Sequence, residues 1–356
     1  MKLYHKKLEL GCYPTPLQRM KRIEKEFSLP VPFYIKREDL SGLGPGGNKV
    51  RCMEYLLEEA VSEGCDTVVA SGPYESNLCT TVAAACAALS LDCALVYNSF
   101  RPEDRRGNMV LNKILDVREV FLGSCSGMER NEKAALLCDG YRAEGKNPFL
   151  IENGASTGLG VLGYIDMLRE IKEGLEKEDG TADKTAGEAA ETTAGPTTET
   201  VTETAGADGR KKLGRIFVPG GNGGIAAGLI CGNYLENMPF EITVISVEHS
   251  KEILENRIKK LIAETEQYVG PIGCELESLC EVTDLYAGNG WGSNTEESSR
   301  MVKRFPHLTG IYIENIYCSK TVVGAVTESG KGESGLPVIY IHTGGFASLF
   351  AQCGPS

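Results

Sequence analysis

The chain has 356 residues, of which 42% are apolar and 24% are charged, and its net charge at pH 7 is −12. This length allows two compact lobes, and no stretch approaches the roughly 18 uninterrupted apolar residues of a membrane helix. The acidic balance argues against nucleic acid or an anionic membrane as a partner, because either would require a basic patch.

Cysteines and histidines give no sign of a disulfide framework or a metal site. The thirteen cysteines include no CxxC pair, and the four histidines lie far apart. This spacing is typical of free buried thiols, and we expect no bound metal. The first residues, MKLYHKKLELGCYP, lack the apolar core of a signal peptide, so we expect a cytoplasmic protein.

Short apolar segments bounded by turn residues alternate with longer segments of helical pattern. The expected strands are 31–37, 66–71, 92–97, 215–219, 242–247 and 337–342. The expected helices are 48–63, 76–90, 104–115, 128–143, 158–175, 223–236, 250–266, 294–304 and 319–329. Strands that alternate with helices predict a parallel, doubly wound α/β architecture.

Residues 176–212 differ from the rest of the chain. Val201 is the only sizeable aliphatic residue among them, and Thr, Ala, Gly and Glu recur without a regular period. Such a segment buries too little apolar surface to offset the entropy of ordering it. We therefore expect a disordered acidic insertion, neutral in function or a site for a partner.

Two glycine-rich turns precede helices. Residues 42–49, GLGPGGNK, end in Lys49, which is either a solvated helix cap or a desolvated, nucleophilic amine. Residues 220–224, GGNGG, follow a strand and open a helix, so that consecutive backbone N–H groups could bind a phosphate. Gly221, Gly223 and Ala226 also fit a dinucleotide-binding fingerprint, with Glu248 after the next strand, so a nicotinamide-dependent dehydrogenase stays a competing hypothesis.

Further clusters of polar and small residues follow or bound the expected strands. They are SGPYESN at 71–77, ENGAST at 152–157, YAGNGWG at 286–292, IYCSK at 316–320 and IHTGG at 341–345. Each alone is typical of helix capping or core packing.

In this order, the segments resemble the D-cysteine desulfhydrase and 1-aminocyclopropane-1-carboxylate (ACC) deaminase family of fold-type II enzymes, which use pyridoxal 5'-phosphate (PLP). The resemblance spans nearly the whole chain and implies two doubly wound open-sheet domains with the PLP cleft between them. The expected domains are 1–52 with 166–356, which bind PLP and include the insertion, and 53–165, the smaller domain. The same resemblance leads us to expect a homodimer that acts on a small amino acid.

The resemblance also implies a role for particular residues. Lys49 carries PLP as a Schiff base, Ser76 contacts the substrate, and Asn77 contacts the 3'-oxygen of the cofactor. Tyr317 lies against the pyridine face, Cys318 lies at the pyridine nitrogen, and Tyr286 acts near the substrate together with Trp291 and Thr343. The phosphate is bound by the loop of Gly220, Gly221, Asn222, Gly223 and Gly224.

Several positions depart from the family pattern. Ile225 replaces the usual Thr after the phosphate loop, Trp291 replaces a Tyr, and Cys52 replaces a basic residue. At position 318 the deaminases carry Glu and the desulfhydrases Thr, whereas this chain has Cys; Thr343 is similar to the desulfhydrases, since the deaminases carry Leu there. The balance favours desulfhydration over ACC deamination.

We therefore expect α,β-elimination. Substrate displaces Lys49, an α-proton is removed by the freed amine or a neighbouring group, the β-substituent leaves, and aminoacrylate hydrolyses to a 2-oxo acid and ammonia. With D-cysteine the products would be pyruvate, sulfide and ammonia. The alternatives are ACC deaminase or another amino-acid ammonia-lyase, the dehydrogenase, and a PLP-binding protein with weak catalysis.

Overall fold

Two open sheets organise the chain. The computed structural model describes residues 5–189, 204–205, 211–290, 292–331 and 335–352. The smaller sheet has the order β5(Arg118–Phe121), β4(Asp92–Tyr97), β3(Thr67–Gly72) and β6(Pro148–Ile151), and its neighbours all pair in parallel. The larger has the order β1(Leu17–Arg19), β2(Phe33–Arg37), β12(Val338–His342), β9(Gly214–Gly220), β10(Phe240–Ser246) and β11(Glu281–Thr283), and only β1 runs antiparallel.

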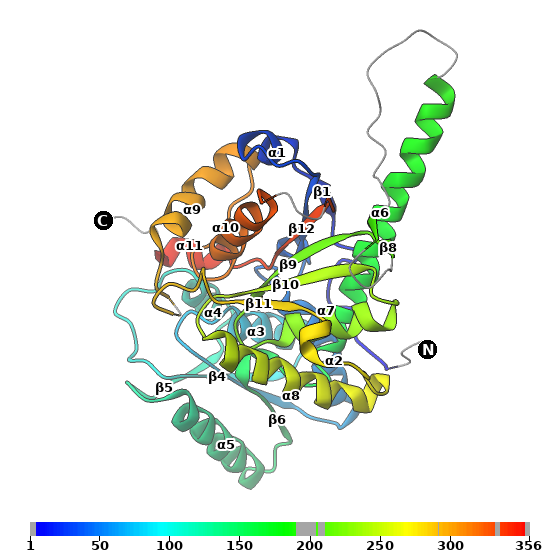
Figure 1. The fold of residues 1–356 in the computed structure, drawn as a ribbon. Coiled ribbons are helices and arrows are strands. Elements are labelled where there is room, and N and C mark those ends of the chain that lie inside the picture. The colour runs from blue at the N-terminus through cyan, green and yellow to red at the C-terminus, as the bar shows by residue number, and fades with distance from the viewer. Residues whose placement is uncertain (1–4, 190–203, 206–210, 291, 332–334, 353–356) are drawn as a thin grey trace.

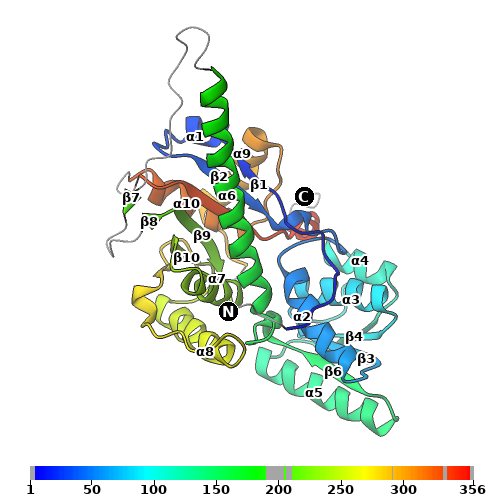
Figure 2. The same cartoon turned by 90° about the vertical axis from the view of Figure 1, so that its right-hand side faces the viewer.

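Helices cover both faces of each sheet (Figure 1). Around the smaller sheet lie α2(Lys49–Ser62), α3(Asn77–Leu89), α4(Asn108–Ile114) and α5(Gly127–Ala143). Around the larger lie α1(Lys21–Glu26), α7(Gly224–Leu235), α8(Lys251–Val269), α9(Glu296–Thr309), α10(Cys318–Ser329) and α11(Phe346–Gln352). The long helix α6(Leu162–Ala189) packs against α2 on one side and α7 on the other (Figure 2). The predicted doubly wound α/β class is confirmed.

The insertion expected at 176–212 is partly helical, which corrects the prediction. Helix α6 continues to Ala189, and β7(Thr204–Ala205) pairs with β8(Lys211–Lys212) in an antiparallel two-stranded sheet. A helix propagates more easily than it nucleates, and the packed turns up to Leu175 supply the nucleus for a segment rich in Ala, Glu and Lys. Residues 190–203 and 206–210 lie outside the described residues.

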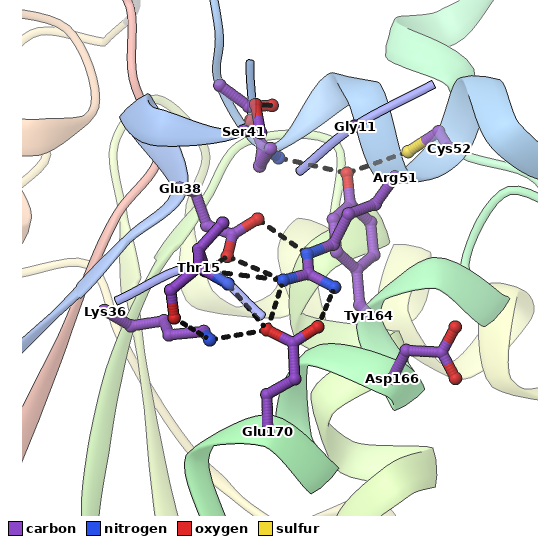
Figure 3. A network of polar contacts seen from close by, with 12 residues as sticks. Gly11, Thr15, Lys36, Glu38, Ser41, Arg51, Cys52, Tyr164, Asp166 and Glu170 are labelled. Atoms are coloured by element: carbon purple, nitrogen blue, oxygen red, sulfur yellow. Dashed lines mark hydrogen bonds and ion pairs between the residues drawn. The ribbon is translucent and has the colours of Figure 1, made fainter. Parts of the chain in front are cut away.

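A buried ionic network joins the elements around the start of α2 (Figure 3). The guanidinium of Arg51 binds Glu38 at 2.6 and 2.9 Å and Glu170 at 2.7 and 2.9 Å. Lys36 donates to Glu170 at 2.6 Å and to the carbonyl of Thr15 at 2.7 Å. Arg51 is 1% exposed and Lys36 and Glu38 are 0% exposed, so each charge depends on the others in place of water.

The network generates a stability prediction. Arg51→Met leaves Glu38 buried without a cation, and we expect the free energy of unfolding to fall by about 3–5 kcal/mol in chemical denaturation. Arg142→Met removes an exposed ion pair with Asp139 and serves as the control, because exposed pairs contribute little. Equal, small losses in both variants would show that the buried network contributes nothing special to stability.

Candidate active site

A cavity of about 980 Å³ lies where the carboxyl ends of strands from both sheets meet. Parallel sheets place their ligands at this edge. Among the expected site residues, the lining includes Lys49, Ser76, Asn77, Gly221, Asn222, Gly223, Gly224, Tyr317 and Thr343. Gly220 and Cys318 lie directly behind the lining, next to residues that form it. The sequence segments that suggested a common site are thus neighbours in space.

Lys49 opens α2 and points into this cavity. The preceding turn needs glycine, because Gly46 and Gly47 have φ of +71° and +109° and a Cβ on Gly47 would lie 2.9 Å from the carbonyl of Thr343. Lys49 Nζ donates to the carbonyl of Gly154 at 2.6 Å, and among the described residues it has no carboxylate within ion-pair distance. Desolvation lowers the pKa of Lys49, which favours an unprotonated, nucleophilic amine.

Neutral groups lie beneath Lys49. Cys52, one turn along α2, forms a 2.8 Å hydrogen bond with the hydroxyl of Tyr164, which also accepts from the amide of Asn48 at 3.0 Å. Burial raises the pKa of the Cys52 thiol, so a neutral thiol occupies the position of the family's basic residue. The pKa of Lys49 is therefore lowered by desolvation and not by a second cation at this position.

The loop after β9 forms an open cradle of backbone groups. Gly223 has φ of +87° and α7 begins at Gly224, so the first N–H groups of this helix lie in a glycine-rich part of the cavity wall. A Cβ on Gly221 would lie 3.2 Å from the Tyr317 ring, and one on Gly224 would lie 2.8 Å from Ser156 Oγ. Ile225 lacks the hydroxyl of the usual Thr, but Ser156 offers a hydroxyl beside the same loop, because it also lines the cavity.

Arg257 adds a positive charge to this loop. Its Nη1 donates to Asn222 Oδ1 at 2.8 Å, and its side chain lines the cavity. Sequence reasoning missed Arg257 because it lies within a surface helix, α8, far from any glycine-rich turn. The cradle, Ser156 and Arg257 together suit a phosphate.

Ser76 and Asn77 begin α3 on the opposite wall. Ser76 is the helix N-cap and accepts weakly from the N–H of Cys79 at 3.4 Å. Asn77 Oδ1 accepts from Asn108 at 2.7 Å and from Ser348 at 3.0 Å, so helices α4 and α11 fix its side chain. The wall therefore combines an adaptable hydroxyl with a rigid amide.

Arg130 is a second cation that sequence reasoning missed. It lines the cavity from α5, is 8% exposed, and donates to Ser71 at 2.8 Å and to Asn98 and Asn131 at 3.2 Å. These partners are neutral, and desolvation lowers the pKa of Arg130. A guanidinium without a carboxylate partner among the described residues makes this wall attractive to an anionic substrate group.

Cys318 is a buried neutral thiol at the start of α10. The carboxylate of Glu314 caps this helix, accepting from the N–H groups of Ile316, Tyr317 and Cys318 at 2.6, 2.8 and 2.6 Å. Cys318 Sγ lies 3.5 Å from Thr343 Oγ1, and burial, aided by Glu314, raises its pKa to about 12. The thiol therefore stays protonated at physiological pH.

Tyr286 lies elsewhere than expected. It does not line the cavity, and its hydroxyl donates to Glu328 of α10 at 2.5 Å. Its ring packs against the apolar cluster beneath α10, which accounts for the difference. Trp291 lies outside the described residues.

The buried Lys320 holds the loop of residues 287–290, which follows Tyr286. Lys320 Nζ donates to the carbonyls of Ala287 at 2.6 Å, Val247 at 2.8 Å and Gly290 at 3.1 Å. The residue is 1% exposed and lies two positions after Cys318. It therefore positions the 287–290 loop relative to the helix that begins at the cavity.

Neither a metal cluster nor a membrane span is found in the described part of the chain. Its His, Cys, Asp and Glu side chains form no group of three or more that could bind a metal ion. Its helices include none that is both long and apolar enough to cross a membrane.

Comparison with known proteins agrees with this geometry. Residues 8–344 match the family described as "Pyridoxal-phosphate dependent enzyme". A protein of Pyrococcus horikoshii, which its name assigns provisionally as a 1-aminocyclopropane-1-carboxylate deaminase, is 30% identical over 97% of this chain and 93% of its own. The D-cysteine desulfhydrase of Salmonella typhi is 28% identical over 97% of this chain and 95% of its own.

A solved structure supports the same relationship. A crystal structure described as an ACC deaminase homologue superposes with a TM-score of 0.81 at 28% identity, covering 98% of this chain and 95% of the other. The site fits the cofactor of this family, because a desolvated lysine amine and a phosphate cradle face one cavity. The family match also sets aside the dinucleotide interpretation of Gly221, Gly223 and Ala226. The chain belongs to the family of pyridoxal-phosphate-dependent enzymes, with the fold-type II architecture.

Proposed function

We propose that this enzyme catalyses α,β-elimination on a small amino acid, with D-cysteine converted to pyruvate, sulfide and ammonia. The observation that carries the proposal is the neutral thiol of Cys318, 3.5 Å from the hydroxyl of Thr343, which lines the cavity. Both side chains are closer in chemistry to the desulfhydrases than to the ring-opening deaminases. Full-length similarity to a D-cysteine desulfhydrase supports the same branch.

The residues that would hold PLP are those of the lysine turn, the phosphate cradle and α10. Lys49 would bind its aldehyde carbon, the 220–224 loop with Ser156 and Arg257 its phosphate, and Asn77 its 3'-oxygen. Tyr317 would cover one face of the ring, as its place beside Gly221 allows, where an added Cβ would lie 3.2 Å from the Tyr317 ring. When bound, PLP accepts the electron pair that the α-carbon gains on loss of its proton.

The protein's own groups divide the remaining work. Lys49, released when substrate binds, would remove the α-proton, and the Gly154 carbonyl that accepts from its Nζ would stabilise the resulting ammonium. Ser76 and the N–H groups at the start of α3 would hold the substrate carboxylate, with Arg130 adding positive potential from the same wall. Release of the β-substituent leaves aminoacrylate, which hydrolyses to the 2-oxo acid and ammonia.

Cys318 favours elimination over opening of the ACC ring. A carboxylate beside the pyridine nitrogen would hold it protonated and strengthen electron withdrawal, whereas a neutral thiol is a weak donor and acceptor. Elimination can proceed with a weaker electron sink, because the β-substituent leaves soon after the α-proton is removed. ACC deamination remains the competing activity, since the Pyrococcus relative and the superposed structure carry that name.

We also propose a cytoplasmic homodimer with a domain of residues 53–165 and a larger one formed by 1–52 and 166–356. The strands of the smaller sheet all fall within the first range and those of the larger sheet outside it. An exposed cluster of Tyr312, Phe346 and Phe350 on and beside α11 would suit a subunit interface.

One prediction of the proposed function concerns Lys49. Lys49→Ala should abolish pyruvate formation and the yellow absorbance of covalently bound PLP, because no other lysine among the described residues lines the cavity. Mass spectrometry after borohydride reduction should find the cofactor adduct on the peptide that contains Lys49. The exposed Lys113 provides the control, and Lys113→Ala should keep both properties. An adduct on another lysine would refute the assignment.

Another prediction concerns Cys318. Cys318→Thr should keep elimination within about tenfold of the parent, which corresponds to about 1.4 kcal/mol in the barrier. The parent enzyme should release no ammonia from ACC, measured beside D-cysteine in the same preparation. Robust ammonia release from ACC would move the protein to the deaminase branch.

A further inference from the structure

Glu75 occupies a strained position in the cavity wall. It directly precedes Ser76, lines the cavity, and has φ of +62°. Non-glycine residues rarely adopt this left-handed conformation, and such strain often accompanies functional positions. The turn therefore keeps Glu75 in the cavity wall at a cost to the backbone.

The carboxyl of Glu75 has no hydrogen-bond or ion-pair partner within the described part of the chain. Its Oε1 is shielded from solvent and has no hydrogen-bond partner among the described residues. Its Oε2 abuts Gly107, where an added Cβ would lie 2.7 Å from that oxygen and 2.9 Å from the carbonyl of Ala347. A carboxylate without a partner is costly to bury, so these surroundings favour the protonated acid.

The titratable groups near Glu75 leave its carboxyl in the protonated form. Tyr74 precedes it, and Arg105 and Arg106 lie on the loop before α4, where Arg105 is paired with Glu119 at 2.6 Å. Helix α11, on the far side of Gly107, carries no titratable side chain. Burial raises the pKa of Glu75 to about 7. The group is thus mostly an acid below about pH 7 and mostly a carboxylate above it.

We infer that Glu75 is the proton donor to the departing β-substituent, an inference that rests on the proposed elimination. As the bond from Cβ to sulfur or oxygen breaks, the leaving atom keeps the electron pair and takes the proton of the Glu75 carboxyl. Glu75 is left as a carboxylate and regains a proton from water. Aminoacrylate and a neutral thiol, hydrogen sulfide or water are the products.

This role extends the substrate class to poor leaving groups. Chloride leaves without a proton, a thiol gains moderately from one, and hydroxide requires one. An acid at Glu75 therefore predicts that the enzyme also eliminates water from serine, with the same configuration at Cα as its best thiol substrate. Chloroalanine turnover, in contrast, should not depend on Glu75.

The test compares three substrates in three proteins. Pyruvate release from D-serine, D-cysteine and 3-chloro-D-alanine is measured for the parent enzyme, Glu75→Gln, and Glu103→Gln. Glu103 is an exposed residue of the loop before α4 and is the matched control. We expect Glu75→Gln to lose at least about 100-fold in kcat/KM for D-serine, and less for D-cysteine, because general acids contribute about that much. With 3-chloro-D-alanine the loss should stay within about threefold.

A pH profile gives a second readout. In the parent, kcat/KM for D-serine should fall as pH rises through about 7, where Glu75 loses its proton, and Glu75→Gln should lack this limb. Equal losses on all three substrates, or an unchanged rate with D-serine, would overturn the inference. Absence of pyruvate from 3-chloro-D-alanine in the parent enzyme would instead overturn the proposed elimination itself.

Discussion

The position of Lys49 depends on the buried guanidinium of Arg51. Because the two residues share the first turn of α2, the ion pairs of Arg51 with Glu38 and Glu170 anchor the helix that carries the amine. Burying these charges is costly unless every one is paired, so β2, the start of α2 and α6 must come together in one arrangement. The two lysines therefore differ. The charge of Lys36 is compensated by the carboxylate of Glu170, whereas Lys49 has no carboxylate partner among the described residues.

Desolvation is the common chemical theme of the groups around the cavity. It lowers the pKa of the Lys49 amine and raises those of the Cys318 thiol and the Glu75 carboxyl. Each group is thereby shifted toward its neutral form, and each form has a use: a neutral amine is a nucleophile and base, a neutral acid is a proton donor, and a neutral thiol leaves the neighbouring position uncharged. Enzymes commonly set the roles of titratable groups through their surroundings in this way.

The sequence allowed the main strands and the glycine-rich turns to be predicted, because β2, β3, β4, β9, β10 and β12 are continuous apolar runs. It did not reveal β1, β5, β6 and β11, which are edge strands of only three or four residues. Motif order indicated Lys49 and the glycine-rich loop of residues 220–224, which the structure brings to one cavity. Glu75, Arg130 and Arg257 escaped notice, since their significance comes from burial and from neighbours distant in sequence. Tyr286 is the opposite case. A motif indicated it, but a motif does not fix the direction in which a ring packs.

PLP-dependent α,β-elimination on D-cysteine is the proposed activity of this cavity. The most direct measurement is the stoichiometry of products when the purified enzyme, loaded with PLP, is given D-cysteine or L-cysteine. We expect pyruvate, sulfide and ammonia in equal amounts from D-cysteine, with much slower release from the L-enantiomer. No sulfide from either enantiomer, in a preparation that retains bound PLP, would contradict it.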